Sequence, residues 1–283
     1  TPFVGSGSGH YGLFVGINQY VLDDCGTLPC CEKDIDAMSA AGIQHGGWTS
    51  DSCRRLANEQ ATKANVRAQL ASLAEVAKLG DTVVFYQSSH GGQKTSTSKE
   101  VCLCTYDKEY WDYELAEDLA AFKEGVKLVV VVDACHSGGL FKDRVREAER
   151  FDLAARVMEI MRSRTLVETK GPRRIAPEGI GWITAADYNQ LSKGGSAGSE
   201  FTMAMVDAWT DDDGAADLDG DRRLDFYDLF KAAELVGAKH NAVGQCANES
   251  VLKAVTVRLY SGYVPPVVVE VPGRESVSIP GVW

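Results

Sequence analysis

The sequence has no hydrophobic run long enough to cross a bilayer. A membrane-spanning helix needs roughly 20 consecutive apolar residues, whereas the longest run, residues 126–132, contains Lys127 and has the length of a strand. A secretory signal is not recognisable either, although a trimmed chain would have lost one. These absences predict a protein without membrane association and with a cytoplasmic location, secretion being left open.

Basic residues are few relative to acidic ones. The chain has 29 Lys and Arg against 40 Asp and Glu, which gives a formal net charge of −11. Because nucleic acids are bound mainly through positive surfaces, this balance argues against a nucleic-acid partner. Acidity suits basic peptides and bound cations equally well, and it is also compatible with an ordinary solvated surface.

Repeated C-x-x-C pairs, which are typical of structural zinc sites, are missing as well. In a chain of 283 residues the cysteines indicate a reduced, intracellular protein rather than a disulfide framework. The eight cysteines are Cys25, Cys30, Cys31, Cys53, Cys102, Cys104, Cys135 and Cys246.

The composition that is present, 45% hydrophobic and 24% charged, is ordinary for a folded globular protein. A chain of this length can bury a core for one large or two small domains. Alternating Gly and Ser at positions 5–9 indicate a linker-like or tag-like N-terminus over residues 1–10.

Predicted strands alternate with predicted helices along the chain. Apolar and β-branched runs predict strands at residues 12–17, 52–57, 81–86, 126–132, 181–185 and 251–259. Helical spacing predicts helices at 32–43, 62–80, 115–122, 144–164, 201–209 and 226–236, with Thr62 as an N-cap. The fold class is therefore α/β, with a mostly parallel central β-sheet and helices on both faces.

Two polar clusters follow two of these predicted strands, where functional groups gather in a parallel sheet. His90 lies in the segment SSHGG at 88–92, and Cys135 lies in DACHSGG at 133–139. A thiol attacks a carbonyl only as a thiolate and so needs a nearby base, and backbone N–H groups beside glycines can bind the resulting oxyanion. Either residue alone is more often structural, but the pair is a specific signal for nucleophilic catalysis.

Four segments resemble caspase-like cysteine peptidases, most closely metacaspases and their bacterial relatives, the orthocaspases. They are residues 11–18 (YGLFVGIN), 28–34 (LPCCEKD), 81–91 (DTVVFYQSSHG) and 132–139 (VDACHSGG). His90 also precedes Cys135 by close to the roughly 50 residues that caspase-type enzymes use. The resemblance covers roughly residues 11–260, nearly the whole chain.

The resemblance implies a caspase-hemoglobinase fold in which Cys135 is the nucleophile and His90 the general base. The backbone N–H groups of Gly91 and Cys135 would form the oxyanion hole, and His136 would be structural. The same resemblance divides the chain into a large-subunit-like catalytic region (11–140), a connector (141–178), a small-subunit-like region (179–262) and an extended tail (263–283).

The residues around the nucleophile suggest which substrate is cut. Asp133 precedes Cys135 by two positions, and a carboxylate there favours a cationic side chain before the scissile bond. In metacaspases this Asp pairs with the position that Asp34 occupies, and Cys31 and Ser88 would line the same pocket. Cleavage after Arg or Lys is therefore expected, with a helix-surface charge as the alternative role of Asp34.

Two departures from the family pattern are visible. Ser89 stands where the relatives usually have Gly before the catalytic His, and Cys30 stands where they usually have Gly before the pocket Cys. The second change is expected to alter the turn beside the pocket.

The connector is rich in basic residues. Self-cleavage there is expected if the enzyme prefers basic residues, and an ordinary charged surface helix and loop is the alternative. The candidate sites are Arg162, Arg164, Lys170, Arg173 and Arg174.

Residues 217–228 (DLDGDRRLDFYD) resemble an EF-hand loop, with carboxylates at positions 1, 3, 5, 9 and 12. The predicted Ca²⁺ ligands are Asp217, Asp219, Asp221, Asp225, Asp228 and the carbonyl of Arg223. Arg222 at the usual Gly position and an Asp rather than Glu at the last position weaken the match. An acidic turn without a metal is the alternative, and no organic cofactor is expected.

Other classes of function fit the sequence less well than a peptidase. A catalytically silent caspase-like module that binds Ca²⁺ or a partner would normally have lost the Cys or the His, and both are present. A Cys-dependent phosphatase needs Arg where Phe141 stands, and no Gly-x-Ser-x-Gly elbow surrounds Ser137. We expect a monomer that acts on protein or peptide substrates containing basic residues.

Overall fold

A sheet of eight strands forms the centre of the computed structural model, which describes residues 2–3, 7–21, 25–93, 100–135, 153–165, 174–185, 194–238, 245–260, 267–269 and 277–279. The main path of the sheet is β11-β7-β6-β3-β1-β2, and β4 and β5 extend it from β3. Strands β1, β2, β3, β6 and β7 run parallel, whereas β11 and the β4–β5 extension are antiparallel. The bounds are β1 His10–Gly16, β2 Cys53–Ala57, β3 Thr82–Gln93, β4 Val101–Cys104, β5 Glu109–Trp111, β6 Lys127–Cys135, β7 Ile180–Thr184 and β11 Gln245–Ala247.

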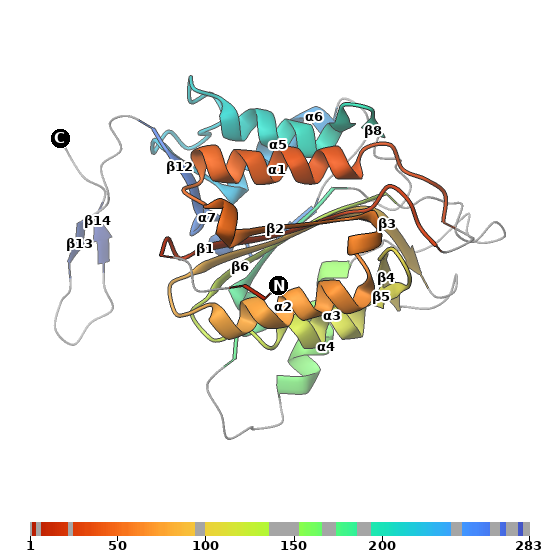
Figure 1. Ribbon diagram of the computed structural model, residues 1–283. Coiled ribbons are helices and arrows are strands. Elements are labelled where there is room, and N and C mark those ends of the chain that lie inside the picture. Colours follow the sequence, from red (N-terminus) through yellow and green to blue (C-terminus); the bar gives the residue numbers. More distant parts are fainter. Residues whose placement is uncertain are drawn as a thin grey trace.

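Helices cover both faces of this sheet (Figure 1). On one face lie α1 (Cys31–His45), α5 (Glu200–Thr210), α6 (Phe226–Ala238) and the short α7 (Glu249–Lys253). On the other face lie α2 (Lys63–Val76), α3 (Asp112–Leu119) and α4 (Leu153–Thr165). The predicted α/β class and the covered parallel sheet are confirmed.

Each face of the sheet has its own hydrophobic core because side chains alternate between the two faces along a strand. On β6, Leu128 and Val130 pack into the core under α2, α3 and α4, whereas Val129 and Val131 pack under α1, α5 and α6. The second core contains Trp209 of α5, whose ring meets that of Trp48 edge-on at 5.5 Å. Strands buried on both faces explain the continuous apolar run at 126–132.

Small strand pairs and single turns complete the described part of the chain. β10 (Arg223–Asp225) pairs with β12 (Thr256–Leu259), β8 (Gly194–Gly195) with β9 (Gly198–Ser199), and β13 (Val267–Val269) with β14 (Val277–Ile279). Short 3₁₀ turns occur at Ser50–Ser52, Asn58–Gln60 and Pro177–Gly179.

Strands β3 and β6 are longer than the apolar runs that predicted them. The strands predicted from the sequence end at residues 86 and 132. In the structure, β3 continues through His90 to Gln93, and β6 continues to Cys135. The two strands pair with each other in register up to His90 and Cys135, and β4 then pairs with the last residues of β3. Backbone pairing, rather than side-chain polarity, therefore sets where these strands end.

One predicted element is wrong in part. Residues 251–259 are not one closing strand of the main sheet: α7 ends at Lys253, and only β12 is extended. β12 pairs with β10 outside the main sheet. The apolar residues Val251 and Leu252 belong to the helix, and the burial of Leu252 against Gly181 of β7 explains the helical choice.

Two regions that were predicted to be a linker (1–10) and a connector (141–178) contribute residues to the core. Phe3 is buried, and its backbone N–H donates a 2.7 Å hydrogen bond to Ser72 Oγ of α2. In α4, Leu153, Val157 and Met161 are buried in the core of that face. The other predicted connector residues, 141–152 and 166–173, lie outside the described residues.

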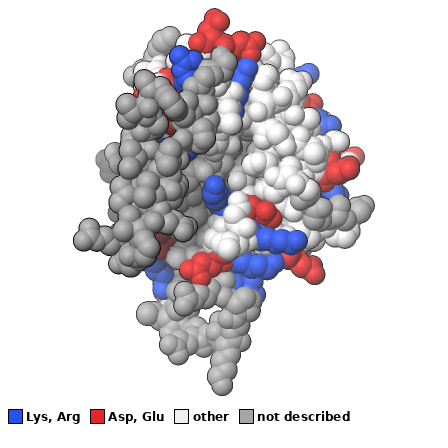
Figure 2. Space-filling view, turned by 90° about the vertical axis from the view of Figure 1, so that its left-hand side faces the viewer, with Lys and Arg blue, Asp and Glu red and all other residues white. Residues whose placement is uncertain are grey.

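Charges of both signs are interspersed over the described part of the face in Figure 2, rather than gathered into one patch of a single sign. Among the described residues, none of the helices is both long and apolar enough to span a bilayer.

The junction between β1 and α1 has no room for a side chain at Gly16. A Cβ there would lie 2.4 Å from the backbone oxygen of Cys31 and 2.9 Å from Ile35 Cγ2. We expect Gly16→Ala to lower the free energy of unfolding by about 1–3 kcal/mol, because backbone of α1 would have to shift. Thermal denaturation measures this loss. Gly7→Ala is the matched control, since a Cβ at Gly7 meets no atom within 4 Å, and an equal Tm for both variants would contradict the packing argument.

Candidate active site

The two predicted catalytic residues lie opposite each other on adjacent parallel strands. His90 of β3 and Cys135, the last residue of β6, are register partners, and neighbouring strands are about 4.8 Å apart. The side chain of Cys135 lies outside the described part of the chain, as does His136. The backbone alone therefore brings the two catalytic motifs to one point of the sheet.

The imidazole of His90 is buried and held by two contacts from the segment after β1. Its Nε2 lies 2.8 Å from the carbonyl oxygen of Gly26, and its ring packs on that of Tyr20 at 5.1 Å. Because a carbonyl only accepts, Nε2 carries a proton, and Nδ1 of the neutral ring is then the basic nitrogen. The backbone N–H of His90 also donates to the Tyr20 hydroxyl at 2.9 Å.

Asp34, on the first turns of α1, is fully buried beside β3. Its Oδ2 accepts a 2.7 Å hydrogen bond from the hydroxyl of Ser88, and its Oδ1 accepts one of 2.7 Å from the backbone N–H of Ser199. The alternative role, a charge on the surface of the helix, is therefore wrong. Among the described residues, Asp34 forms no ion pair with a lysine or arginine.

Asp133 of β6 is buried next to the same cluster. Its Oδ2 accepts hydrogen bonds from the hydroxyl of Ser199 and, at 2.7 Å, from the hydroxyl of Thr202. Thr202 is held in turn by Tyr86, whose hydroxyl lies 2.6 Å away. Strands β3 and β6 and helices α1 and α5 thus meet at this pair of acids.

Burial and the neighbouring carboxylate both act on Asp34. Loss of water raises its pKa from 3.8 to about 7, and the negative charge of Asp133 adds to the shift, while the hydrogen bonds from Ser199 and Ser88 oppose it. Two carboxylates are thus buried close together, and among the described residues no lysine or arginine pairs with Asp34.

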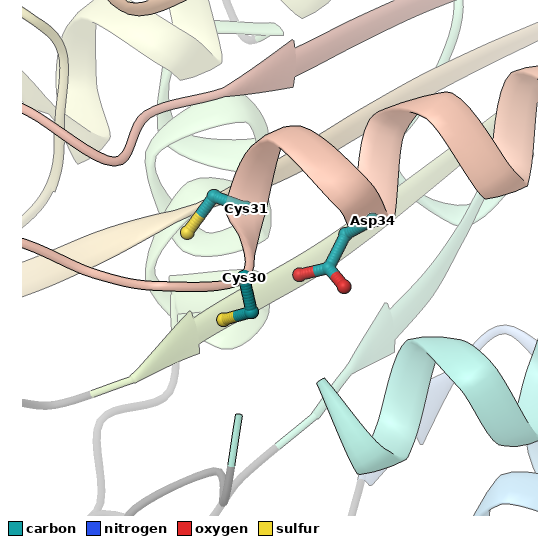
Figure 3. A group of neighbouring side chains, drawn as sticks. All are labelled: Cys30, Cys31 and Asp34. Atoms are coloured by element: carbon teal, nitrogen blue, oxygen red, sulfur yellow. The ribbon is translucent and has the colours of Figure 1, made fainter. Parts of the chain in front are cut away.

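Two cysteines begin α1 beside Asp34 (Figure 3). Cys30 is the N-cap residue and Cys31 the first residue of the helix, and both are buried. A hydrogen bond with Cys30 and loss of water raise the pKa of the Cys31 thiol well above its usual value. Cys31 and Ser88 therefore lie next to Asp34, as the predicted pocket requires.

Ser199, Thr202, Gly26 and Tyr20 belong to this site, and the sequence did not assign them to it. Ser199 and Thr202 are recognisable locally as a helix start, because the Ser199 hydroxyl accepts the Thr202 N–H at 3.0 Å and caps α5. Their contact with Asp133 spans 66 and 69 residues of chain, and no local pattern indicates a contact of that range.

In the acidic loop at 217–228, only three of the five predicted ligand carboxylates lie close together. Carboxylate oxygens of Asp217, Asp219 and Asp221 lie within 4.8 Å of one another. Asp225 and Asp228 instead accept each other's backbone N–H at 3.1 Å, which is a capping box at the start of α6. Burial raises the pKa of Asp228 to about 7.

The backbone of Arg222 has the conformation that EF-hand loops need at this position. Arg222, at the position where such loops use glycine, has φ +62°, the left-handed conformation for which glycine is preferred there. The backbone therefore makes the required turn despite the Arg side chain.

A family model described as the caspase domain matches residues 10–264. The chain therefore belongs to the caspase domain family, as the resemblance in the four sequence segments implied. It is similar to metacaspase-1 of Arabidopsis thaliana, at 30% identity over 205 residues, covering 64% of this chain and 54% of that protein. It is also similar to metacaspase-7 of the same plant, at 26% identity, covering 46% of this chain and 35% of that protein.

The chain spans about half or less of the length of these curated relatives. Among solved structures, it superposes on protein GSU0716 from Geobacter sulfurreducens with a TM-score of 0.61 at 22% identity, covering 89% of this chain and 99% of that one. Caspase-1 from Spodoptera frugiperda gives a TM-score of 0.54 at 12% identity, covering 90% of this chain and 91% of that one. These likenesses confirm the caspase fold.

The raised pKa of Asp34 predicts a specific pH dependence of stability. Between the unfolded pKa near 4 and the folded pKa of about 7, the native state binds more protons than the unfolded state, so stability falls as pH rises. Asp34→Asn removes this loss, and we expect it to stabilise the substrate-free protein by on the order of 2 kcal/mol at pH 8 and by little at pH 4. Urea denaturation at both pH values measures the difference.

Asp36→Asn is the matched control, because Asp36 lies on the same helix, is exposed and pairs with the exposed Arg55. Its effect should stay within about 0.5 kcal/mol at both pH values. A pH-independent effect of Asp34→Asn would contradict the buried-carboxylate argument.

Proposed function

We propose that this protein is a cysteine endopeptidase that hydrolyses peptide bonds after Arg or Lys. The observation that carries the proposal is the pair of buried carboxylates, Asp34 and Asp133, beside the register-matched His90 and Cys135. Membership of the caspase domain family supports the peptidase chemistry. The acidic pocket supports the basic specificity.

The proposed reaction begins with proton transfer from the Cys135 thiol to Nδ1 of His90. The thiolate then attacks the scissile carbonyl carbon, and the carbonyl oxygen becomes an oxyanion that the backbone N–H groups of Gly91 and Cys135 stabilise. Each such donor is worth about 2.7–4 kcal/mol in the transition state. The His90 imidazolium next protonates the leaving amine, the C–N bond breaks, and a thioester to Cys135 remains.

A water molecule completes the cycle. The neutral imidazole of His90 removes a proton from it, the resulting hydroxide attacks the thioester, and the C–S bond breaks to release the carboxylic acid and the thiol. The carbonyl of Gly26 keeps the ring oriented in both halves of the reaction, since its hydrogen bond to Nε2 stabilises the imidazolium that forms twice.

Basic specificity follows from the electrostatics of the pocket. Two carboxylates that are close together and shielded from water favour a guanidinium or ammonium, which relieves their repulsion and restores the lost solvation. An acidic substrate side chain would add a third negative charge to the same site. Arg suits two carboxylates better than Lys, because its planar fork donates in more than one direction.

A second candidate function is a catalytically silent module with the caspase fold. The presence of His90, Cys135 and both pocket acids argues against it. Covalent labelling of Cys135 by a chloromethyl ketone with a basic side chain, located by peptide mass spectrometry, separates the two functions, since a silent module would not react faster than free thiols do.

Reporter peptides ending in Arg, Lys or Asp test the specificity. We expect turnover after Arg and Lys, none after Asp, and complete loss in Cys135→Ala. Asp34→Asn should lower kcat/KM for the Arg peptide by about 10²-fold or more, because Asp133 and the substrate cation lose a buried partner. Asp36→Asn, with its exposed carboxylate, should change kcat/KM by less than about twofold. Turnover of the Asp peptide alone would overturn the proposed pocket.

We also propose that the acidic loop binds Ca²⁺ through Asp217, Asp219, Asp221 and the carbonyl of Arg223. Asp225 and Asp228 would join as ligands only by giving up hydrogen bonds within their capping box. Helix α5 (Glu200–Thr210) is capped by Ser199 at the acidic pair, and its other end lies just before this loop. Ordering of the loop would therefore stabilise the helix that holds Asp133 in place.

Self-cleavage in the connector belongs to the same proposal. Arg162 and Arg174 are exposed at the two described ends of the region, and Arg164, Lys170 and Arg173 lie outside the described side chains. A basic side chain of the same chain is a substrate that the acidic pocket would accept.

One experiment tests calcium binding and self-cleavage together. The purified chain is incubated with Ca²⁺ or with a chelator, and we expect Ca²⁺ to raise Tm and to produce two fragments cut between residues 141 and 178. Cys135→Ala should keep the rise in Tm but stay intact. Asp219→Asn should lose the rise, whereas Asp213→Asn, a nearby exposed acid outside the ligand set, should retain it. A Tm unchanged by Ca²⁺ would refute the metal site, and fragments in Cys135→Ala would refute self-cleavage.

A further inference from the structure

The start of α1 brings two thiols and a carboxylate to one point. One sulfur from each of Cys30 and Cys31 and one oxygen of Asp34 lie within 4.8 Å of one another, and all three residues are buried. Figure 3 shows the Asp34 carboxylate directed back toward the two cysteines at the beginning of the helix. The described cysteines on other elements are not part of any such three-ligand group with a carboxylate.

The first turn of the helix produces this grouping. The backbone N–H of Asp34 donates to the carbonyl of Cys30 at 3.0 Å, so Asp34 lies one helical turn after Cys30. Residues four apart share a face of a helix, and Cys31 follows directly after the N-cap residue. A glycine at position 30 would leave only one thiol here.

The donor set determines which metal would fit. Zn²⁺, a borderline ion, binds both thiolates and carboxylates in tetrahedral sites, whereas Ca²⁺ and Mg²⁺ require oxygen ligands, so the two soft thiolates favour Zn²⁺ here. An ionised carboxylate has about four lone-pair positions. Asp34 uses two of them for Ser88 and Ser199, and a third accepts a hydrogen bond from the Cys30 side chain, which a bound metal would replace. Because a tetrahedral ion takes four ligands and the protein supplies three, the fourth coordination position would be open to water.

We propose that Cys30, Cys31 and Asp34 form a binding site for a thiophilic divalent cation such as Zn²⁺, and that occupation of this site blocks the substrate pocket. Both thiols release their protons as the two metal–sulfur bonds form, without any change in oxidation state, so that affinity rises with pH. The cation would occupy the position beside Asp34 that the proposed function reserves for the basic side chain of the substrate. The inhibitory part of this proposal therefore rests on that function, whereas the binding part does not.

Binding is tested first in Cys135→Ala, which removes the predicted nucleophile as a competing ligand. Titration with Co²⁺ should give one equivalent with the visible bands of a tetrahedral ion and a thiolate-to-metal charge-transfer band, and Zn²⁺ should displace it. Adding Cys30→Ser or Cys31→Ser should lower the affinity by more than about 100-fold, since loss of an outer-shell partner alone costs 10- to 100-fold.

Two further cysteines serve as controls. Cys102→Ser removes a buried thiol of β4, and Cys246→Ser removes a half-buried thiol of β11. In the Cys135→Ala background both should retain the spectrum. The proposal is refuted if Co²⁺ gives no tetrahedral thiolate spectrum, or if Cys30→Ser and Cys31→Ser bind Co²⁺ with unchanged affinity and spectrum. It is also refuted if either control loses the spectrum while these two variants keep it.

Inhibition is measured separately with otherwise wild-type protein and the Arg reporter peptide. Zn²⁺ should inhibit the wild type, and Cys30→Ser should require at least about tenfold more Zn²⁺ for the same inhibition. Equal inhibition of both would refute the block of the pocket while leaving the binding result intact. Failure to cleave any basic peptide would count against the proposed function alone, because the spectroscopic titration does not depend on it.

Discussion

The structure depends on holding two carboxylates, Asp34 and Asp133, away from water and close to each other. Such a pair costs free energy unless hydrogen bonds compensate the lost hydration. Here the compensation comes from the hydroxyls of Ser88, Ser199 and Thr202 and the backbone N–H of Ser199. These donors lie on strand β3 and at the start of α5, and the acids lie on helix α1 and strand β6, so the acid pair joins four elements beside the predicted catalytic residues.

The residual repulsion in this pair has a functional meaning. A pocket that only stabilised the fold would be more favourable with an apolar or fully neutralised cluster, since a buried charge without its partner is costly. The pKa of Asp34 is raised to about 7 because the ionised carboxylate is destabilised by burial and by the charge of Asp133. This value lies within the physiological pH range. A bound cation would supply the missing interaction, which is why the same feature supports the proposed basic specificity and, through the neighbouring thiols, the proposed metal site.

The segment that follows β1 connects these two roles. Gly26 orients His90 through its carbonyl, and Cys30 and Cys31 follow a few residues later at the start of α1. The hydroxyl of Tyr20, from the same segment, accepts the backbone N–H of His90. The residue that orients the base and the two cysteines thus lie on the same stretch of chain.

The fold class, the alternation of strands and helices, the Thr62 cap and the family were predictable from sequence, because hydrophobic periodicity and short motifs are local properties. The Thr62 hydroxyl does accept the Asn65 N–H. Residues 251–259 were predicted wrongly, since an apolar run suits a strand or a buried helix, and packing against β7 decides between them. The roles of the pocket acids and of the acidic loop stay predictions.

By itself the sequence determined which chemical groups are available: a thiol, an imidazole, two carboxylates, and the adjacent cysteines at positions 30 and 31. Only the tertiary structure decided how they meet. The β3–β6 register sets His90 opposite Cys135, and Ser199, from a distant helix, reaches both acids. Hydrogen bonds between residues far apart in the chain depend on sheet pairing and core packing, which no local pattern encodes.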